Sequence, residues 1–260
     1  MKKQLIALVF AFVPSVVLAA GAEYPLESAD VDLRDKASLQ DGARTFVNYC
    51  MGCHSTQYQR YERVANDLGI PDELMMENMV FPESALIGEH MKIGMRPEDS
   101  KGWLGVAPPD LTNDARVRGE DWIYTYLKTF YIDPARPVGV NNKVFPNAAM
   151  PNVLEELQGR QVIGCKAMPV KEDGKIQKDS LTGEIVMDEQ CDVLTVVEGT
   201  GVQSEEEFDT TIRNLTAFLA YSGDPIKLER HRIGAYVLLY LAFFFIFAYL
   251  LKREYWKDVH

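Results

Sequence analysis

The feature that most constrains this chain is Cys50-Met51-Gly52-Cys53-His54, a C-x-x-C-H motif. Two thiols at this spacing can each form a thioether with one of the two vinyl groups of a haem, and the histidine that follows then lies beneath the iron. A thioredoxin-like redox pair is disfavoured because no strand is predicted before the motif and His54 follows it directly. A zinc site would need a second ligand pair, and the sequence has no other C-x-x-C or H-x-x-H. The motif therefore predicts covalent attachment of a c-type haem, around which the chain must fold.

The residues before the motif have helical spacing. Ser38 and Asp41 form an S-x-x-D pattern that is typical of a helix N-terminus. Helical spacing then places Phe46, Val47 and Cys50 on one side. This helix would deliver the first thiol to an apolar face, where a haem would complete the core.

Two further helices are predicted downstream. A capping-box pattern at Ser204-Glu205-Glu206-Glu207 precedes apolar residues at helical spacing, and Gly223 and Pro225 end that segment. Residues 119–130 form a third candidate helix with acidic residues in its first turn. The C-x-x-C-H motif resembles that of the cytochromes c, and this resemblance implies a fold in which an N-terminal and a C-terminal helix cross beside the haem. The first and last of these helices fit those places. The expected fold class is mostly α, a cytochrome c-like haem domain with a single C-terminal transmembrane helix.

The N-terminal segment resembles a secretory signal peptide. Lys2 and Lys3 precede an apolar stretch over 5–18, and small residues follow at 19–22. An uncleaved membrane anchor is the alternative interpretation, although the apolar run is short. We expect residues 1–22 to be removed and the rest of the body to lie outside the cytoplasm.

A second apolar segment, residues 233–251, carries no charged side chain. As a helix it would be about 28 Å long, close to the hydrocarbon thickness of a bilayer. A buried core helix would show a polar face, whereas here basic residues flank the run on both sides and Tyr255 and Trp256 resemble interfacial anchors. The expected organisation is a signal peptide over 1–22, an extracytoplasmic haem domain over 23–225, and an anchor with a short cytoplasmic tail over 226–260.

The charge of the chain bears on its partners. The formal net charge is −11, which argues against a nucleic-acid binder because such proteins need basic surface to displace counterions from phosphates. Residues 23–225 hold 35 acidic and 19 basic residues, so the expected haem domain is more acidic than the whole chain. An acidic surface would attract a basic protein partner and speed their encounter at low salt.

The second axial ligand decides between classes of haem protein. A strong sixth ligand closes the iron and leaves electron transfer, whereas an open site could bind small molecules or react with peroxide. Met150 lies in Ala148-Ala149-Met150-Pro151, where the residue before proline is held in an extended conformation. From the residues alone, Met150 is as consistent with core packing as with ligation. His90 remains a bis-histidine alternative.

Several segments together resemble the cytochrome c1 family, the haem-bearing membrane subunits of ubiquinol–cytochrome c oxidoreductase (cytochrome bc1) complexes. The resemblance covers most of the chain from about Tyr24 onward, and its combination of segments is more specific than C-x-x-C-H alone. It rests on the C-x-x-C-H motif followed by Ser55, Tyr58 and Tyr61, on Ala107-Pro108-Pro109-Asp110-Leu111, on Arg116, Arg118 and Gly119-Glu120-Asp121-Trp122, on Phe145-Pro146 with Ala149-Met150-Pro151, and on the terminal anchor.

The resemblance implies roles for individual residues. One haem c would be attached through Cys50 and Cys53, with His54 and Met150 as the axial ligands of the iron. Pro108 and Pro109 would line the haem pocket, and Arg116 and Arg118 would lie near the propionates, Arg118 being the better candidate for a charge-assisted contact.

The function implied is a one-electron relay from the Rieske iron–sulfur protein through haem c to a soluble or tethered cytochrome c. The chain would sit beside the cytochrome b subunit in a dimeric complex, as its electron-transfer subunit rather than as an enzyme alone. It would be anchored in a bacterial inner membrane with the haem domain in the periplasm. Two alternatives stay open: a c-type cytochrome subunit of a terminal oxidase or nitric-oxide reductase, and an anchored haem peroxidase or gas sensor.

Two cysteines lie outside the haem motif. In an oxidising compartment Cys165 and Cys191 predict a disulfide, and the turn-rich segment 165–191 between them predicts a hairpin-like insertion. The segment begins shortly after Met150. The bridge could therefore steady the ligand loop or merely tie down the insertion, and the sequence does not separate these two hypotheses.

Overall fold

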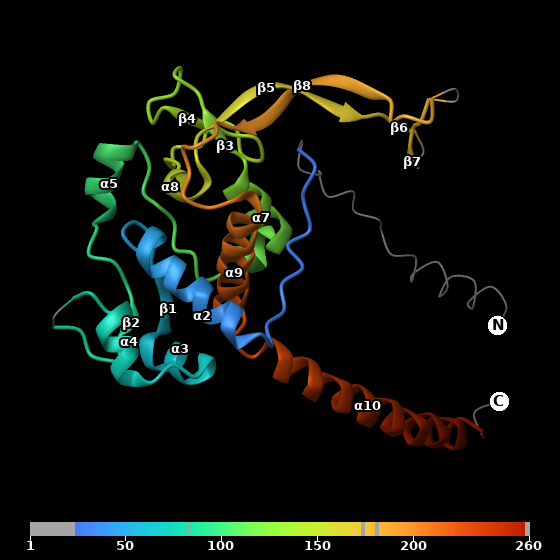
Figure 1. The fold of residues 1–260 in the computed structure, drawn as a ribbon. Coiled ribbons are helices and arrows are strands. Elements are labelled where there is room, and N and C mark those ends of the chain that lie inside the picture. Colours follow the sequence, from blue (N-terminus) through green and yellow to red (C-terminus); the bar gives the residue numbers. More distant parts are fainter. Residues whose placement is uncertain (1–23, 83, 173–174, 180–181, 258–260) are drawn as a thin grey trace.

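The computed structural model describes residues 24–82, 84–172, 175–179 and 182–257, so the expected signal peptide lies outside the described residues. Figure 1 shows a mostly helical body, a ribbon of two long strands and a C-terminal helix that leaves the body. This confirms the predicted fold class.

The helices are α2 (Lys36–Thr45), the π-helical turn η1 (Phe46–Cys50), α3 (Tyr61–Leu68), α4 (Asp72–Met79), α5 (Pro97–Leu104), α6 (Asp114–Arg118), α7 (Glu120–Lys128), α8 (Glu155–Gln158), α9 (Glu205–Gly223) and α10 (Lys227–Tyr255). The strands are β1 (Thr56–Arg60), β2 (His90–Met91), β3 (Phe130–Ile132), β4 (Val140–Asn142), β5 (Gln161–Pro169), β6 (Lys171–Glu172), β7 (Lys175–Ile176) and β8 (Met187–Val196), which pair antiparallel as β1–β2, β3–β4, β5–β8 and β6–β7.

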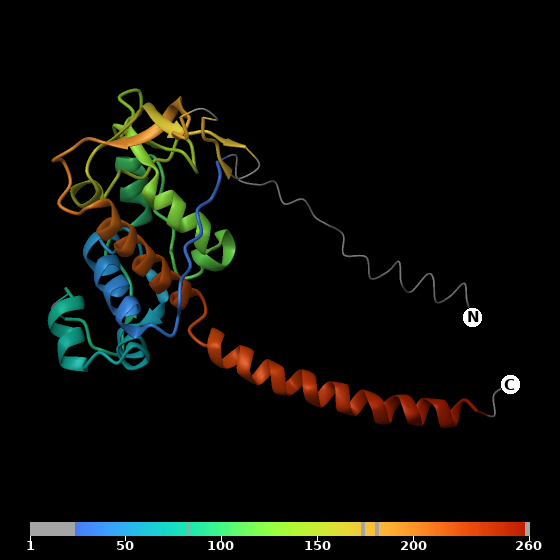
Figure 2. The same ribbon diagram turned by 45° about the vertical axis from the view of Figure 1, so that its right-hand side comes forward.

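The centre of the body is the contact between α2 and α9, which lie side by side in both ribbon views (Figures 1 and 2). A glycine makes this approach possible. A Cβ atom added at Gly42 would lie 2.0 Å from the carbonyl oxygen of Asn214, so a larger residue does not fit. Phe46, just beyond α2, packs on Phe218 of α9 with ring centroids 5.5 Å apart. The expected contact between the N-terminal and C-terminal helices is therefore present.

The local sequence correctly predicted the residue that caps the N-terminus of α9, but not the one that caps α2. α9 begins with the predicted capping box, in which Ser204 Oγ accepts from the Glu207 amide at 3.3 Å and the Ser204 amide donates to Glu207 Oε2 at 2.8 Å. The predicted start of the first helix at Ser38 was wrong. Asp35 caps α2 by accepting from two amides of its first turn. Ser38 instead lies within α2 and donates to Asn214 Oδ1 of α9 at 2.7 Å, so tertiary packing uses its hydroxyl.

α7 confirms the third predicted helix, although it ends at Lys128, two residues before the expected end. The N-terminal segment before α2 runs along α7: the Glu27 amide donates to Thr125 Oγ1 at 2.8 Å and the Ala29 amide donates to Asp121 Oδ1 at 2.8 Å. These bonds fix α7 between the N-terminal segment and α9, next to the chain segment that carries Met150.

The ribbon of β5 and β8 forms the predicted hairpin-like insertion and projects from the body (Figure 1). Cys165 lies opposite Cys191 in the antiparallel register, and the two are joined by a disulfide. At the base of the ribbon, Gln161 Nε2 donates to the carbonyl oxygen of Phe130 at 2.7 Å. The ribbon is thus anchored to β3, close to the loop that follows β4.

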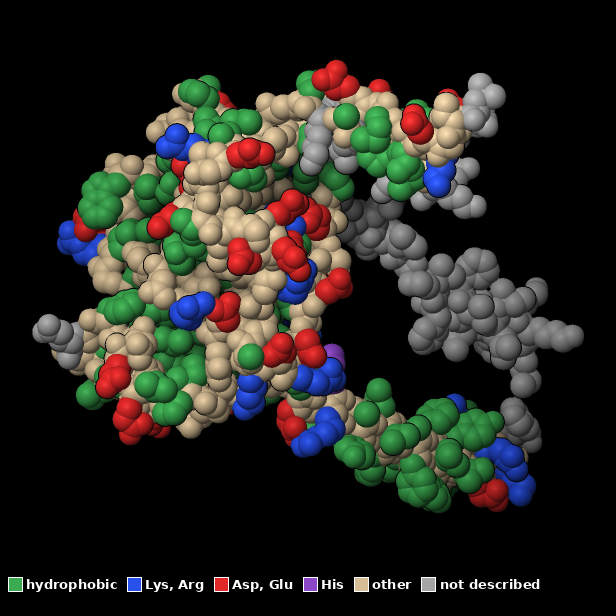
Figure 3. Space-filling view, in the orientation of Figure 1, with side chains coloured by type: hydrophobic (Ala, Val, Ile, Leu, Met, Phe, Trp, Pro, Cys, Tyr) green, Lys and Arg blue, Asp and Glu red, His purple; other side chains and the backbone are tan. Residues whose placement is uncertain are grey.

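The C-terminal helix α10 is 29 residues long, and it contains an 18-residue apolar window that has a mean hydropathy of 2.3 and is 0% buried. Apolar side chains cover it, with basic side chains gathered near both ends (Figure 3). Length and composition make α10 suitable as a single-pass membrane anchor.

Candidate functional site

A large apolar cavity lies between the C-x-x-C-H segment, α7, α9 and the loops that precede α6 and α8. It encloses about 1250 Å³, counting its open mouth. Leu215 and Leu219, from the predicted apolar face of α9, form part of its wall. It also contains most of the residues expected at the site: Cys50, Cys53, His54, Pro108, Pro109, Arg118 and Met150.

The C-x-x-C-H segment is held by a compact set of backbone bonds. The amides of Cys53 and His54 both donate to the carbonyl oxygen of Cys50, at 3.0 and 2.9 Å. The π-helical turn η1 comes just before this segment and ends at Cys50. Such turns are common at functional sites because they redirect side chains relative to an α-helix. Both thiols and the imidazole consequently line one cavity.

The imidazole of His54 is oriented by the opposite wall. Its Nδ1 lies 2.7 Å from the carbonyl oxygen of Pro109, which can only accept, so Nδ1 carries the proton. Burial lowers the pKa of His54, and the hydrogen bond to Pro109 opposes this only in part. The ring is therefore neutral, with Nε2 left to bind a metal.

The two cysteines of the motif are free, as attachment of a haem requires. Cys50 is buried, and Cys53 is half-buried. Burial, and then the neighbouring Cys53, raise the pKa of the Cys50 thiol to about 12. The protonated thiol is therefore the stable form of Cys50 at neutral pH in this environment.

Met150 lies on the loop after β4, and we call residues 143–151 the ligand loop because the family resemblance predicts Met150 as a ligand. Its side chain is half-buried and lines the cavity. Tyr126 of α7 donates its hydroxyl to Met150 Sδ at 3.5 Å. Burial raises the pKa of Tyr126 to about 12, so the phenol keeps its proton at neutral pH. The thioether is therefore held from the side of α7.

The two expected arginines lie in different places. Arg118 lines the cavity, with its guanidinium 4.3 Å from the ring centroid of Trp122 and its Nε 3.2 Å from Asp114 Oδ1. Arg116 is directed to the C-terminal end of α9, where its Nη1 lies 3.4 Å from the carbonyl oxygen of Gly223. The cavity therefore favours Arg118 as a partner for anionic groups of a ligand.

His90, the alternative axial ligand, lies in β2 and lines a separate hollow with Tyr61 and Glu89. Met91, its neighbour in β2, is fully buried, as is Met75. The structure thus brings Met150, rather than His90, to the cavity that contains His54.

The aromatic wall of the cavity was not predicted from the sequence. Trp122 and Tyr126 stack with centroids 4.9 Å apart, and Tyr126 meets Phe130 edge-on at 5.0 Å. Trp122 and Tyr126 are four residues apart on a helix that was predicted, so their shared face was a usable signal. Only the fold, however, brings that face to Met150.

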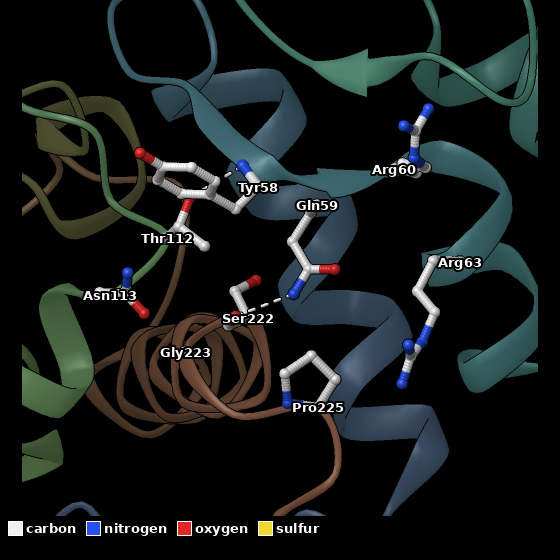
Figure 4. A pocket seen from close by; sticks show the side chains of 9 residues that line it. All are labelled: Tyr58, Gln59, Arg60, Arg63, Thr112, Asn113, Ser222, Gly223 and Pro225. Atoms are coloured by element: carbon white, nitrogen blue, oxygen red, sulfur yellow. Dashed lines mark hydrogen bonds between the residues drawn. The ribbon is translucent and has the colours of Figure 1, made fainter.

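Another hollow, of about 740 Å³ when its open mouth is counted in the same way, lies at the C-terminal end of α9 (Figure 4). Gln59 crosses it and donates to the carbonyl oxygen of Ser222 at 2.8 Å. The two arginines at its edge are already engaged, Arg60 with the carbonyl oxygen of Gly88 and Arg63 with Asp67. The apolar cavity, and not this hollow, has the groups that a cofactor needs.

Comparison with known proteins agrees with the geometry. A profile of the Cytochrome C1 family matches residues 30–259. The chain is 48% identical over 260 residues to cytochrome c1 of Allochromatium vinosum, with 100% of both chains covered. It is also 37% identical over 247 residues to a protein of Nitrosomonas europaea named ammonia monooxygenase gamma subunit, covering 95% of this chain and 94% of that one. The C-x-x-C-H cavity, the single apolar C-terminal helix and the full-length match agree, and the chain belongs to the cytochrome c1 family.

Proposed function

We propose that this chain carries single electrons within a ubiquinol–cytochrome c oxidoreductase, from the Rieske iron–sulfur protein to a soluble or tethered cytochrome c. Membership of the cytochrome c1 family supports an electron carrier of the bc1 complex. The observation that carries the site assignment is that a C-x-x-C-H segment and Met150 line the same apolar cavity. Quinol oxidation would belong to the cytochrome b subunit.

The groups in the cavity fit one covalently bound haem c. Cys50 and Cys53 would provide the two thioether links, and His54 Nε2 and Met150 Sδ would be the axial ligands. The fit rests on free thiols, an imidazole whose other nitrogen is bonded to Pro109, and a thioether in an apolar wall. When bound, the haem supplies a one-electron iron couple, and thioether ligation favours its ferrous state.

The surrounding residues would set the conditions for that couple. The carbonyl of Pro109 fixes the tautomer and orientation of His54. Pro108 and Pro109 form a rigid part of the wall, which helps to exclude water. Arg118 is the residue we assign to a propionate, because its guanidinium lines the cavity. For Arg116 the position at the end of α9 supports a structural role instead.

The placement of the chain in the membrane follows from its parts. We infer a signal peptide over residues 1–22, a periplasmic haem domain over 23–225, and an anchor with a short cytoplasmic tail over 226–260. The length and composition of α10 support a single span in a bacterial inner membrane. This anchor would lie beside the cytochrome b subunit, and the whole complex would be a dimer.

The excess of acidic residues supports a basic electron acceptor. Residues 23–225 carry 35 acidic and 19 basic residues, so the haem domain attracts a positively charged cytochrome c over a distance. Such attraction raises the association rate more than the affinity of the final complex. We therefore expect electron transfer to the acceptor to slow as salt rises.

The second relative favours one further candidate. Because a chain 37% identical is named as a subunit of ammonia monooxygenase, this chain could carry electrons within a complex that holds a monooxygenase instead. Purification of the intact complex in mild detergent separates the two. A bc1 assignment predicts co-purification with a haem b protein and a [2Fe–2S] protein, in a complex that reduces cytochrome c with quinol. Recovery without these two centres would refute it.

A further inference from the structure

We propose that Asn142 and Tyr126 are positioning residues for Met150, forming a clamp that joins the ligand loop to α7. This inference rests on the proposed role of Met150 as an axial ligand. It concerns how the thioether is kept in place, because the ligand loop has no strand or helix of its own to hold it.

Asn142 holds the start of the ligand loop. Its side chain is 1% exposed and lies at the end of β4. Its Oδ1 accepts from the amides of Val144 and Phe145, at 2.9 and 3.0 Å. Its Nδ2 donates to the carbonyl oxygen of Tyr126 at 2.7 Å. One buried amide thus ties two loop residues to the last turn of α7.

Asn141 holds the middle of the same loop. Its Oδ1 accepts from the amide of Asn147 at 2.7 Å, three residues before Met150. Asn147 has a φ of +65°, a left-handed conformation that asparagine tolerates better than most residues. The bond from Asn141 therefore fixes the turn that points the chain toward Met150.

Tyr126 closes the clamp from the other side. Its carbonyl accepts from Asn142, and its hydroxyl donates to Met150 Sδ at 3.5 Å. Stacking on Trp122 and an edge contact with Phe130 leave its ring little freedom. One residue of α7 thus holds the beginning of the ligand loop through its backbone and the proposed ligand through its side chain.

The clamp has two expected effects on the iron site. First, it favours the conformation in which Met150 is in place over one in which the loop has moved away. Second, a hydrogen bond to sulfur withdraws electron density from the thioether, which weakens its stabilisation of ferric iron more than of ferrous iron. Loss of either part should therefore lower the midpoint potential and make the sixth position easier to open.

The test uses the full-length holoprotein in its complex, with carbon monoxide as the probe of an open sixth position. Tyr126→Phe removes one oxygen, and Asn142→Ala removes the buried amide. Tyr124→Phe is the matched control, because Tyr124 lies on the same helix and bonds Asp209 rather than the ligand loop. Gln59→Ala is the control for losing a buried amide, since Gln59 is buried, bonds the carbonyl oxygen of Ser222 and lines the other hollow rather than the ligand loop.

For Tyr126→Phe we expect the apparent affinity of the reduced protein for carbon monoxide to rise about fivefold, the factor that corresponds to one net hydrogen bond. For Asn142→Ala we expect at least about tenfold, because more than one bond is lost. The midpoint potential should fall in both, and the sulfur-to-iron charge-transfer band should weaken. Both controls should stay within about twofold of wild type.

Measurement of Met150→Ala separates this inference from the proposed function. If that variant binds carbon monoxide no better than wild type, Met150 is not the ligand and the site assignment fails. A second outcome would refute the clamp alone. If Met150→Ala binds carbon monoxide more tightly than wild type, but Tyr126→Phe has the same carbon monoxide affinity and midpoint potential as Tyr124→Phe, the assignment of Met150 as a ligand is kept and the clamp is refuted. Should Asn142→Ala fail to accumulate, Tyr126→Phe alone decides the outcome.

Discussion

Gly42 gives the sharpest test of the packing that supports the haem domain. A Cβ at this position would lie 2.0 Å from Asn214 O, 2.6 Å from Asn214 C and 2.9 Å from Phe218 Cβ. Two of these atoms are backbone, so no side-chain rotation relieves the overlap in Gly42→Ala. α2 and α9 would have to separate by more than an ångström, and overpacking of this kind costs about 1–3 kcal/mol. We place Gly42→Ala at the upper end, near 3 kcal/mol, because the neighbouring contact of Phe46 with Phe218 would loosen as well.

Thermal unfolding of the purified holoprotein measures this cost. A loss of about 3 kcal/mol corresponds to a fall in Tm of roughly 6 to 12 °C for a domain of this size. Gly102→Ala is the matched control, because Gly102 also lies in a helix, α5, and a Cβ there meets nothing within 4 Å. That variant should be neutral or slightly more stable than wild type. Cys50 follows Gly42 by about two helical turns, so Gly42→Ala should also lower the yield of attached haem. A Gly42→Ala protein as stable as Gly102→Ala, with full haem content, would refute the account of the α2–α9 contact.

Three further predictions concern the disulfide, the pH dependence of stability and the acidic surface. Replacing both Cys165 and Cys191 by serine should destabilise the ribbon, by about 3 to 4 kcal/mol in the chain-entropy model. The double replacement should also shift the midpoint potential, because Asp192 beside the bridge forms an ion pair with Lys143 of the ligand loop. An unchanged potential would mean that the bridge only ties down the insertion. Burial alone would raise the pKa of Asp209, but hydrogen bonds from Lys128 and Tyr124 lower this pKa below its usual value. The ionised Asp209 carboxylate therefore stabilises the folded protein at neutral pH, and this stabilisation is lost as the pH falls below about 4. Asp209→Asn should flatten the loss of stability measured by urea unfolding between pH 5 and 3, and an acid limb as steep as that of wild type would contradict this. Turnover with a basic cytochrome c should fall as ionic strength rises, and a rate independent of salt would show that the acidic residues do not steer docking.

Local sequence rules predicted those parts of the fold that local interactions decide. The capping box at Ser204 and the apolar face that follows it gave α9, because both depend on residues within a few turns. Two cysteines outside the motif in an oxidising compartment gave the disulfide, which the register of β5 and β8 confirms. The start of α2 was misplaced because both Asp35 and Ser38 can cap a helix, and the contact with Asn214 decides between them.

The site required more than spacing. The C-x-x-C-H motif identifies the expected haem attachment residues by itself. Nothing in the local sequence, however, distinguished a Met150 that binds iron from a methionine that packs in the core. The contact with Tyr126 depends on how the ligand loop folds back onto α7, through bonds between residues distant in the sequence. Arg116 and Arg118 lie two residues apart on one short helix, so their side chains point in different directions, and only one of them reaches the cavity.

The midpoint potential and optical spectrum of wild type and Met150→Ala decide whether Met150 is a ligand of the haem iron. For the wild type we predict the reduced-minus-oxidised spectrum of a c-type haem, with a sulfur-to-iron charge-transfer band in the oxidised form. In Met150→Ala that band should disappear and the potential should drop strongly, because a thioether that favours ferrous iron is gone. A Met150→Ala protein with the spectrum and potential of wild type would contradict the assignment of Met150 and, with it, the closed electron-transfer site proposed for this chain.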